Sequence, residues 1–370
     1  MMDIKIYGTG TPTYQLAKSR IVRHLTDAGI DYQLHEVTKV TDIIKDDIMS
    51  VPAIKVNGNL LFEIKQNGSY NKTLRSTVQN ILKVGNFGKM TKIIVPTDFS
   101  GTSFNAYNFA NYLAKDLKGV ILLTHVYYPT STEANQFSII NDEAEKIHEK
   151  KLGEYVESLN NDWIGNFIKE PMIEGVFRVG FPRIELIEMS KQPGSVMVMG
   201  TTGEGDAFKK LFGSLSLDML DQCHCPLFLI PPGAAYSQNK EIVYLSEDLK
   251  NDSLHLLYAG RLCMKMSTDL RIIHFKANQD GPYDIMDTKK LLESYYPMVR
   301  YNIDVVETSD LFSSIKDVVT DTDHQRLVVL STKHRNLFQN LFHKSVTEYA
   351  ALHSHASLLI LSEKSLGSES

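Results

Sequence analysis

The sequence predicts an α/β protein in which two doubly wound, parallel-sheet domains follow a smaller N-terminal domain. Two observations support this prediction. Short apolar runs rich in β-branched residues alternate with helix-like amphipathic stretches over most of the chain, which is typical of buried parallel strands joined by helices. In addition, the pattern of residues 92–232 recurs in residues 240–362, which indicates that one domain has been duplicated.

The composition is that of a globular protein. The chain has 370 residues, of which 43% are hydrophobic and 22% charged, enough for two or three domains of ordinary size. Its formal net charge of −5 argues against a protein whose main partner is nucleic acid. The three cysteines do not suggest a disulfide framework, and we recognise neither a secretory signal nor an apolar run of membrane-spanning length. We therefore expect a cytoplasmic protein with no nucleic-acid and no membrane partner.

Residues 1–88 form the first predicted domain. Residues 1–90 carry a net charge of +4 and the remainder −9, and the change falls near the poorly patterned stretch KVGNFGKM. Strands are expected at DIKIYG, DYQLHEV, IKV and LLFEI, the last two joined by the turn-forming pair Asn57-Gly58. Helices are expected at residues 14–29, 40–48 and 70–83.

The order of these elements and the stretch MSVPAIKVNG resemble the small thioredoxin- or glutaredoxin-like domains. In those domains a Cys-x-x-Cys pair precedes the first helix, but here the corresponding residues are Thr11-Pro12-Thr13-Tyr14, and residues 1–90 contain no cysteine. Because dithiol exchange needs thiols, we expect a thioredoxin-like domain without redox cysteines. Val51-Pro52 matches the cis-proline of that family; it either shapes a partner-binding surface beside Thr11 and Tyr14 or is purely structural.

Residues 90–235 form the second predicted domain, in which strands and helices alternate. Strands are expected at KIIVP, VILLTHV, MIEGVFRV, SVMVMG and PLFLIPP. Between them, helices are expected at residues 103–117, 143–159, 182–192 and 214–222. Ligands of such sheets bind beyond the carboxyl ends of the strands, so this is where we look for a site.

A glycine-rich stretch, GTTGEGDAFKKLFGS, joins the strand SVMVMG to the helix at residues 214–222. Free amides and the dipole at a helix N-terminus favour an anion, and glycine lets the backbone approach a phosphate closely. The stretch is no P-loop, because Gly205 is followed by Asp-Ala, and no dinucleotide loop, because Phe208 replaces the third glycine. Its own spacing is Gly-x2-Gly-x9-Gly-Ser, formed by Gly200, Gly203, Gly213 and Ser214.

With this spacing, residues 92–232 resemble the nucleotide-binding branch of the universal stress protein family, and residues 240–362 resemble it more weakly. The stretches VPTDFS, LLTHV, GFP and CPLFLI belong to the same resemblance. It implies a Rossmann-like fold, a regulatory role in a stress response and ATP, alone or with Mg²⁺, as the ligand. The positions that match the ligand contacts of the family are Pro96, Thr97, Asp98, Val126, Met199, Gly200, Gly203, Gly213, Ser214, Leu215 and Ser216.

Each of these positions also has a structural interpretation. Asp98 could cap the helix that follows it, Val126 could be a core residue, and the glycines could form a flexible loop. His125, which recurs as His274, is interpreted as a packing residue. Cys223 and Cys225 are interpreted as structural because no second ligand pair stands at zinc spacing. We recognise no catalytic set of residues, so we favour nucleotide binding over catalysis, with slow ATP hydrolysis as an alternative.

Residues 240–364 form the third predicted domain, which repeats the pattern without its glycines. The loop STKHRNLFQNLFHKS has Ser331, His334 and Lys344 where the first copy has glycine, so we expect a degenerate nucleotide site. The resemblance implies that the last strands, PLFLIP and SLLILS, pair with each other, because universal stress proteins commonly pair through this strand. Such a pair would satisfy the exposed backbone groups of both strands and join the two repeats as an intrachain pseudo-dimer. A further homodimer, an unknown protein partner and a nucleotide-independent interaction scaffold stay open as alternatives.

Overall fold

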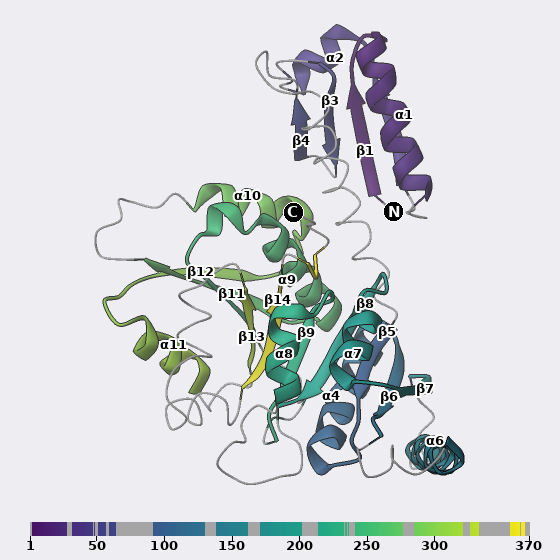
Figure 1. Cartoon of the computed structure of the whole chain (residues 1–370). Coiled ribbons are helices and arrows are strands. Elements are labelled where there is room, and N and C mark those ends of the chain that lie inside the picture. The colour runs from purple at the N-terminus through teal and green to yellow at the C-terminus, as the bar shows by residue number, and fades with distance from the viewer. Residues whose placement is uncertain are drawn as a thin grey trace. The chain divides into compact units, whose positions relative to one another are not determined.

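The structure is a computed structural model, and its described residues form two sheets, one of four strands and one of ten (Figure 1). They fall into two compact units, of which the first holds Met1–Lys89 with Leu256–Tyr258 and Asp284–Met298, and the second holds the remainder. The described residues are 2–27, 32–46, 48, 51–56, 59–63, 92–129, 138–161, 171–201, 214–232, 234, 236, 241–276, 285–320, 326–332, 356–362 and 364–366.

The N-terminal sheet has the strand order β2-β1-β3-β4, with β1 and β2 parallel and the other neighbours antiparallel. Its core is formed by apolar residues of β1, β3 and α1, which are buried on one another. The expected strands are present and the Val51–Pro52 peptide bond is cis, whereas Asn57-Gly58 and the helix expected at residues 70–83 lie outside the described residues. The elements are β1 (Met2–Tyr7), α1 (Pro12–Asp27), β2 (Tyr32–Val37), α2 (Val40–Lys45), β3 (Ala53–Val56) and β4 (Asn59–Glu63).

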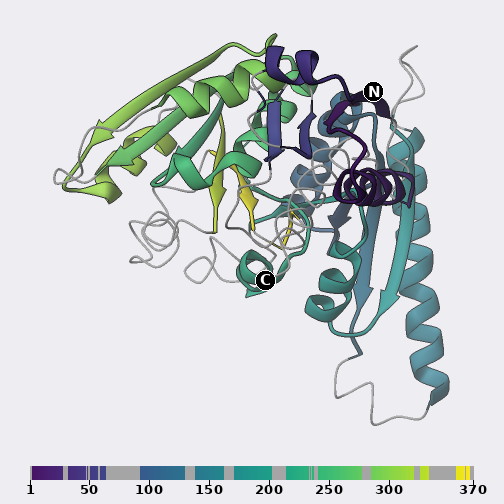
Figure 2. The ribbon, with the colours of Figure 1, turned by 90° about the horizontal axis from the view of Figure 1, so that it is seen from above.

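The first repeat contributes five strands to the ten-stranded sheet, in the order β9-β8-β5-β6-β7, all parallel. The strands β8 and β9 are almost completely buried, as expected for continuous apolar runs covered on both faces. Helix α6 lies along β6 and β7 (Figures 1 and 2). The elements are β5 (Lys92–Pro96), α4 (Gly101–Leu117), β6 (Val120–Tyr127), α6 (Ser138–Asn161), β7 (Ile173–Val179), α7 (Pro182–Ser190), β8 (Ser195–Gly200), α8 (Ser214–Gln222) and β9 (Leu227–Ile230).

The second repeat contributes the other five strands in the matching order β14-β13-β10-β11-β12, again all parallel. The predicted fold class is therefore confirmed: two parallel-sheet halves accompany a small N-terminal sheet. The elements of this repeat are β10 (Glu241–Ser246), η2 (Leu249–Asn251), α9 (Ser253–Met266), β11 (Asp269–Lys276), α10 (Met286–Tyr295), β12 (Tyr301–Glu307), α11 (Leu311–Thr320), β13 (Arg326–Ser331) and β14 (Ser357–Leu361).

The two halves of the large sheet meet at β9 and β14, which pair antiparallel with Phe228 opposite Leu359. Both residues are completely buried, and one cluster of core side chains continues from β8 and β9 into β13 and β14. The last strands thus pair within the chain, where each would otherwise be a sheet edge with unpaired backbone groups. No helix in the described part of the chain combines the length and the apolar character that crossing a membrane requires.

Candidate functional site

A cavity of about 240 Å³ lies at the carboxyl ends of β5, β6 and β8 in the first repeat. This is the end of a doubly wound sheet at which ligands bind. Eight of the eleven predicted site residues line it; Ser214 is the first residue of α8, and Gly203 and Gly213 lie outside the described residues. The lining residues are Pro96, Thr97, Asp98, Ser103, Thr124, His125, Val126, Pro182, Leu186, Met199, Gly200, Thr201, Leu215 and Ser216.

Thr97 fixes the turn that leaves β5 toward the cavity. Its backbone N–H donates to the carbonyl oxygen of Thr124 over 2.8 Å. Its hydroxyl accepts from the backbone N–H of Phe99 over 3.0 Å and lies 3.1 Å from the hydroxyl of Ser103. A hydroxyl that bonds the backbone two residues ahead is a common way of closing a turn. The turn is therefore held by β6 on one side and by helix α4 on the other.

Asp98 stands at the tip of this turn and is exposed at the cavity. Its Oδ1 atom accepts from the backbone N–H of Ser100 over 3.0 Å and from the Ser100 hydroxyl over 2.5 Å. Ser100 itself is the N-cap of α4, because its Oγ accepts from the backbone N–H of Ser103 over 3.2 Å. The interpretation of Asp98 as the helix cap is therefore wrong: the cap is two residues further on, and Asp98 orients it.

The electrostatic surroundings of Asp98 favour its carboxylate form. Partial burial raises the pKa of Asp98, but hydrogen bonds from the side chain and the backbone of Ser100 outweigh burial and hold the pKa below its ordinary value. The Ser103 side chain and the Asp98 backbone N–H lower the pKa of Asp98 further. Asp98 therefore presents a charged acceptor to the cavity, suited to a ligand that carries an N–H or O–H group.

Gly200 ends β8 beside the first turn of α4. A Cβ atom at this position would lie 2.6 Å from Cγ2 and 3.0 Å from the carbonyl oxygen of Thr102, so only glycine fits without displacing neighbours. Directly after it, the backbone N–H of Thr201 donates to Ile230 over 3.1 Å, and the Ser216 hydroxyl donates to the Thr201 carbonyl over 3.3 Å. The end of β8 is thereby tied to the first turn of α8.

The first turn of α8 borders the cavity through Leu215 and Ser216. The first amides of a helix have no partner within the helix, and together with the helix dipole they favour an anion. The cavity lining thus includes a carboxylate as well as the first turn of a helix. This combination suits a ligand that has hydrogen-bond donors and a negative charge.

His125 is buried, with 8% of its surface exposed, and it also lines the cavity. The sequence analysis interpreted it only as a packing residue. Its Nδ1 lies 2.9 Å from the carbonyl oxygen of Thr97, and its Nε2 lies 3.1 Å from Nδ1 of His148 on α6. Burial lowers the pKa of His125, and the hydrogen bond to Thr97 opposes this effect.

The sequence reasoning also missed five other residues that line the cavity, Ser103, Thr124, Pro182, Leu186 and Thr201. The stretches LLTHV and GFP already contained Thr124, His125 and Pro182, so their place at strand ends could have identified them.

The second repeat places buried polar side chains at the corresponding ends of its strands. Ser246, at the end of β10, donates to Asp252 over 2.6 Å, and Ser331, at the end of β13, lies 3.1 Å from Nε2 of His255. Ser246 and Ser331 are completely buried. Ser331 occupies the sequence position that corresponds to Gly200, and its buried hydroxyl meets His255 there. The rest of the counterpart loop, residues 333–355, lies outside the described residues.

Cys223 and Cys225 are buried at the start of β9, with their Sγ atoms 3.5 Å apart. Burial raises the pKa of the Cys225 thiol, which the neighbouring Cys223 sulfur raises further. Within the part of the chain that the structure describes, His, Cys, Asp and Glu side chains do not gather in groups of three or more suited to a metal ion.

In the N-terminal domain, Thr11 and Tyr14 have structural roles. Tyr14 is 1% exposed, and its ring occupies the space beside Gly8, where a Cβ would lie 2.3 Å from the ring. The Thr11 hydroxyl accepts from the Tyr14 backbone N–H over 3.3 Å, and the Tyr14 hydroxyl donates to Glu36 over 2.6 Å. The Tyr14 ring is thus part of the core, and a partner surface beside it, shaped by Val51-Pro52, stays a prediction.

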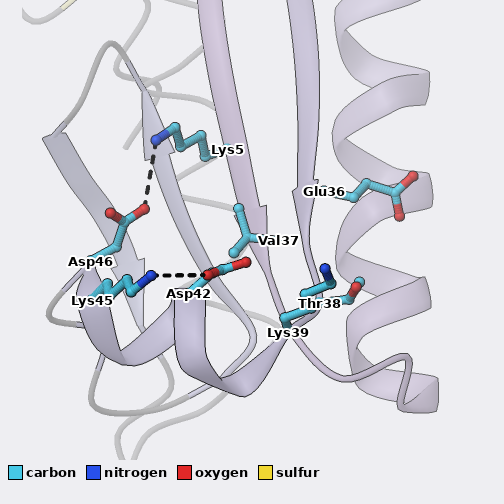
Figure 3. Close-up of a pocket in the computed structure, with 8 residues that line it drawn as sticks. All are labelled: Lys5, Glu36, Val37, Thr38, Lys39, Asp42, Lys45 and Asp46. Carbon is cyan, nitrogen blue, oxygen red and sulfur yellow. Dashed lines mark ion pairs between the residues drawn. The ribbon is translucent and has the colours of Figure 1, made fainter.

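A cavity of about 400 Å³ lies between β2 and α2 in the same domain (Figure 3). Lys5 pairs with Asp46 over 3.6 Å, and Lys45 pairs with Asp42 over 3.9 Å. Because carboxylates accompany the lysines that line it, this cavity has no single sign of charge, and we assign it no ligand.

Comparisons with known proteins agree with this geometry. The model of the universal stress protein family matches residues 89–231, and a thioredoxin domain model matches residues 2–64. A universal stress protein of Methanocaldococcus jannaschii is 26% identical over 144 residues, which are 38% of this chain and 81% of that protein. The crystal structure of a universal stress protein from Archaeoglobus fulgidus is similar in fold, with a TM-score of 0.54 and 18% identity, over 73% of this chain and 98% of that chain. The protein thus contains a domain of the universal stress protein family at residues 89–231, preceded by a thioredoxin-like domain.

Proposed function

We propose that the first repeat binds ATP in the cavity at the ends of β5, β6 and β8, and that the protein acts as a nucleotide-dependent regulator of a stress response. The observation that carries this proposal is that the lining of one cavity contains both the Asp98 carboxylate and the first turn of α8. A purine with an exocyclic amine at one end and phosphates at the other has the complementary pattern. The family match at residues 89–231 supports the same conclusion.

Each part of the ligand then has a partner. The Asp98 carboxylate would accept a hydrogen bond from the base, with Pro96, Thr97 and Val126 as the walls around it. Met199 and Gly200, at the end of β8, would approach the ribose, where a side chain at position 200 would collide with α4 as well as with the ligand. The phosphates, alone or with Mg²⁺, would extend along the glycine-rich stretch to the α8 N-terminus, held by Gly203, Gly213, Ser214, Leu215 and Ser216.

We further propose that the chain is built from three domains, residues 1–88, 90–235 and 240–364, and that the second repeat is a partner that does not bind nucleotide. The buried Ser331–His255 contact supports the second part, because it occupies the strand end where the first repeat leaves a cavity. The antiparallel β9–β14 pair supports an intrachain pseudo-dimer of the two repeats.

The proposed site is tested by calorimetry with a matched pair of variants. Asp98→Ala removes the acceptor for the base, whereas Glu247→Ala changes its counterpart in the second repeat. A hydrogen bond to a charged group contributes about 1.5–3 kcal/mol, so Asp98→Ala should weaken ATP binding roughly 10- to 150-fold. Glu247→Ala should leave it within about twofold. Equal losses in both variants, or no heat of binding in the wild type with or without Mg²⁺, would overturn the proposal.

A second candidate function is that of an interaction scaffold, favoured by an apolar surface beside the cavity. Phe181 and Tyr128 are 56% and 46% exposed, with ring centroids 4.5 Å apart, and Ile184 nearby is 55% exposed. Exposed apolar groups of this kind occur at protein interaction sites. A partner that binds through this surface should be lost on Phe181→Ser and Ile184→Ser but retained in Asp98→Ala. Retention of the partner by the double serine variant would count against this candidate.

A further inference from the structure

His125 connects the ligand turn of the first repeat to helix α6. Its Nδ1 lies 2.9 Å from the Thr97 carbonyl oxygen, and its Nε2 lies 3.1 Å from Nδ1 of His148. The two imidazole rings are stacked, with centroids 5.3 Å apart and planes inclined by 6°. Thr97 belongs to the turn and His148 to the middle of α6, so one side chain holds two elements that are far apart in sequence.

The same face of α6 makes two further contacts with the turn. Lys151 Nζ lies 4.2 Å from the centroid of the Phe99 ring, and the Tyr155 ring meets Phe99 edge-on at 5.5 Å. His148, Lys151 and Tyr155 are spaced three and four residues apart, which puts them on one side of a helix. Phe99 has a φ of +65°, a strained conformation for a residue other than glycine. The residues of the turn would not favour this backbone conformation by themselves, and the contacts of α6 with Phe99 help to hold it.

The hydrogen bonds of His125 determine where its protons lie. The Thr97 carbonyl can only accept, so Nδ1 of His125 carries a hydrogen, and Nε2 of the neutral ring is an acceptor. His148 must then donate from its own Nδ1. A proton added to the outer Nε2 of His148 keeps this arrangement. A second proton, placed on Nε2 of His125, would put two N–H groups face to face 3.1 Å apart and break the bond.

The charged groups around the pair oppose a second proton. Lys151 on α6 and a protonated His148 both repel a cation on His125, and Asp98 in the turn attracts it. Phe177 of β7, whose ring centroid is 6.2 Å from that of His125, does not titrate. Burial is the largest cause that lowers the pKa of His125; the hydrogen bond to Thr97 and the charge of Asp98 raise it, and the charges of His148 and Lys151 lower it further. The hydrogen-bonded pair is therefore the stable form at neutral pH and loses its bond on acidification.

We propose that His148 is a positioning residue for the nucleotide site: through His125 it holds the Thr97–Asp98 turn in the shape that receives the base, and acidification weakens ATP binding by breaking the pair. This inference rests on the proposed ATP site. His148 does not line the cavity, so it acts on the ligand only through His125 and the turn.

Two substitutions of His148 test its hydrogen bond to His125. In His148→Asn, the side-chain amide can place an N–H donor close to the position of Nδ1, and it can turn its oxygen toward Nε2–H when His125 is protonated. In His148→Leu, no hydrogen-bonding group is left at this position. His35→Asn serves as the control, because His35 is an exposed histidine of the N-terminal domain, paired with Asp3 over 3.4 Å.

ATP affinity of the full chain is measured by calorimetry between pH 8 and pH 5.5. The wild type and His35→Asn should lose affinity as the pH falls. His148→Leu should bind about three- to tenfold more weakly at pH 8, the effect of one neutral hydrogen bond. His148→Asn should recover most of that loss and show a flatter pH profile. If His148→Leu has the affinity and pH profile of the wild type, the inference is wrong.

Histidine ¹⁵N NMR of the ligand-free protein gives a second readout that needs no nucleotide. It should show His125 as the Nδ1–H tautomer in the wild type and in His148→Asn. An Nε2–H tautomer of His125 in the wild type would overturn the inference. If the wild type binds no ATP at any pH, the proposed function fails, whereas a change in the ¹⁵N shift of His125 Nε2 between the wild type and His148→Leu still reports the hydrogen bond from His148. Circular dichroism confirms folding, and if His148→Leu does not fold, the comparison of the wild type with His148→Asn still decides the outcome.

Discussion

Gly200 lies so close to Thr102 that a Cβ atom on Gly200 would stand 2.6 Å from Thr102 Cγ2. This contact joins the end of β8 to the first turn of α4, and both elements contribute residues to the cavity lining, Gly200 and Ser103. The glycine is thus required by packing as well as by close approach of a ligand. A loss of binding on its substitution would not by itself identify a ligand contact, and stability has to be measured beside it.

Gly200→Ala should lower the free energy of unfolding by about 1–3 kcal/mol, because the added methyl group overlaps backbone and side chain of α4. Urea unfolding measures the effect. The matched control is Gly153→Ala in the middle of α6, where nothing lies within 4 Å of an added Cβ. That substitution should raise stability by about 0.5–1 kcal/mol through helix propensity. The same sign for both variants would contradict the packing described for Gly200.

Ser100→Ala should lower the free energy of unfolding by about 1 kcal/mol through loss of the α4 N-cap. It should also raise the pKa of Asp98, because the side-chain hydrogen bond that lowers it is lost. Carboxyl titration by NMR measures the pKa, and urea unfolding measures the stability. Ser158→Ala, on the exposed side of α6, is the control and should change stability by less than about 0.5 kcal/mol. An unchanged pKa of Asp98 in Ser100→Ala would show that Ser100 does not orient it.

The stability of the first repeat should fall on acidification below about pH 6.5, the ordinary pKa of histidine. Because the pKa of His125 is lowered in the folded state, the unfolded chain binds more protons between that pKa and about 6.5. Neutral His125 therefore contributes its full stabilisation of the folded state above about pH 6.5. This contribution is lost as the pH falls through the pKa that His125 has in the folded state. The difference in melting temperature between wild type and His125→Gln should shrink from pH 8 to pH 5.5. A constant difference would contradict the assignment.

Tyr14→Phe should lower the free energy of unfolding of the N-terminal domain by about 0.5–1.5 kcal/mol, because the buried hydroxyl loses its bond to Glu36. Gly8→Ala should cost more, since its Cβ would overlap the Tyr14 ring. Tyr112→Phe, with a ring 44% exposed, is the control. A Tyr14→Phe variant as stable as the control would argue that Tyr14 does not anchor this core.

The strands of the large sheet could be predicted because their apolar runs are continuous and recur in the second half of the chain. The β9–β14 pair could be predicted from the resemblance to universal stress proteins, which commonly pair through their last strand, and it removes two bare sheet edges. The side-chain roles could not be read in this way. The cap of α4 depends on which of two neighbouring oxygens reaches the Ser103 amide, and the distance selects Ser100 over Asp98.

His125 and Tyr14 show the same limit for buried residues. The link from His125 to His148 joins residues 23 positions apart through the fold of α6 onto β6, and no sequence spacing encodes it. Tyr14 occupies a position that carries a reactive residue in related folds, yet the small Gly8 beside it turns that position into a core site. Both roles depend on neighbours that only the folded chain supplies.

The number of ATP molecules bound per chain tests the central claim most directly. Any nucleotide that co-purifies with the protein is first removed and identified by chromatography. Equilibrium dialysis of the full chain against labelled ATP then gives the number bound. The account predicts one ATP per chain at saturation, because the cavity lined by Asp98 and α8 lies in the first repeat, whereas Ser331 and His255 meet at the corresponding strand end of the second repeat. Two ATP per chain, or none, would contradict it.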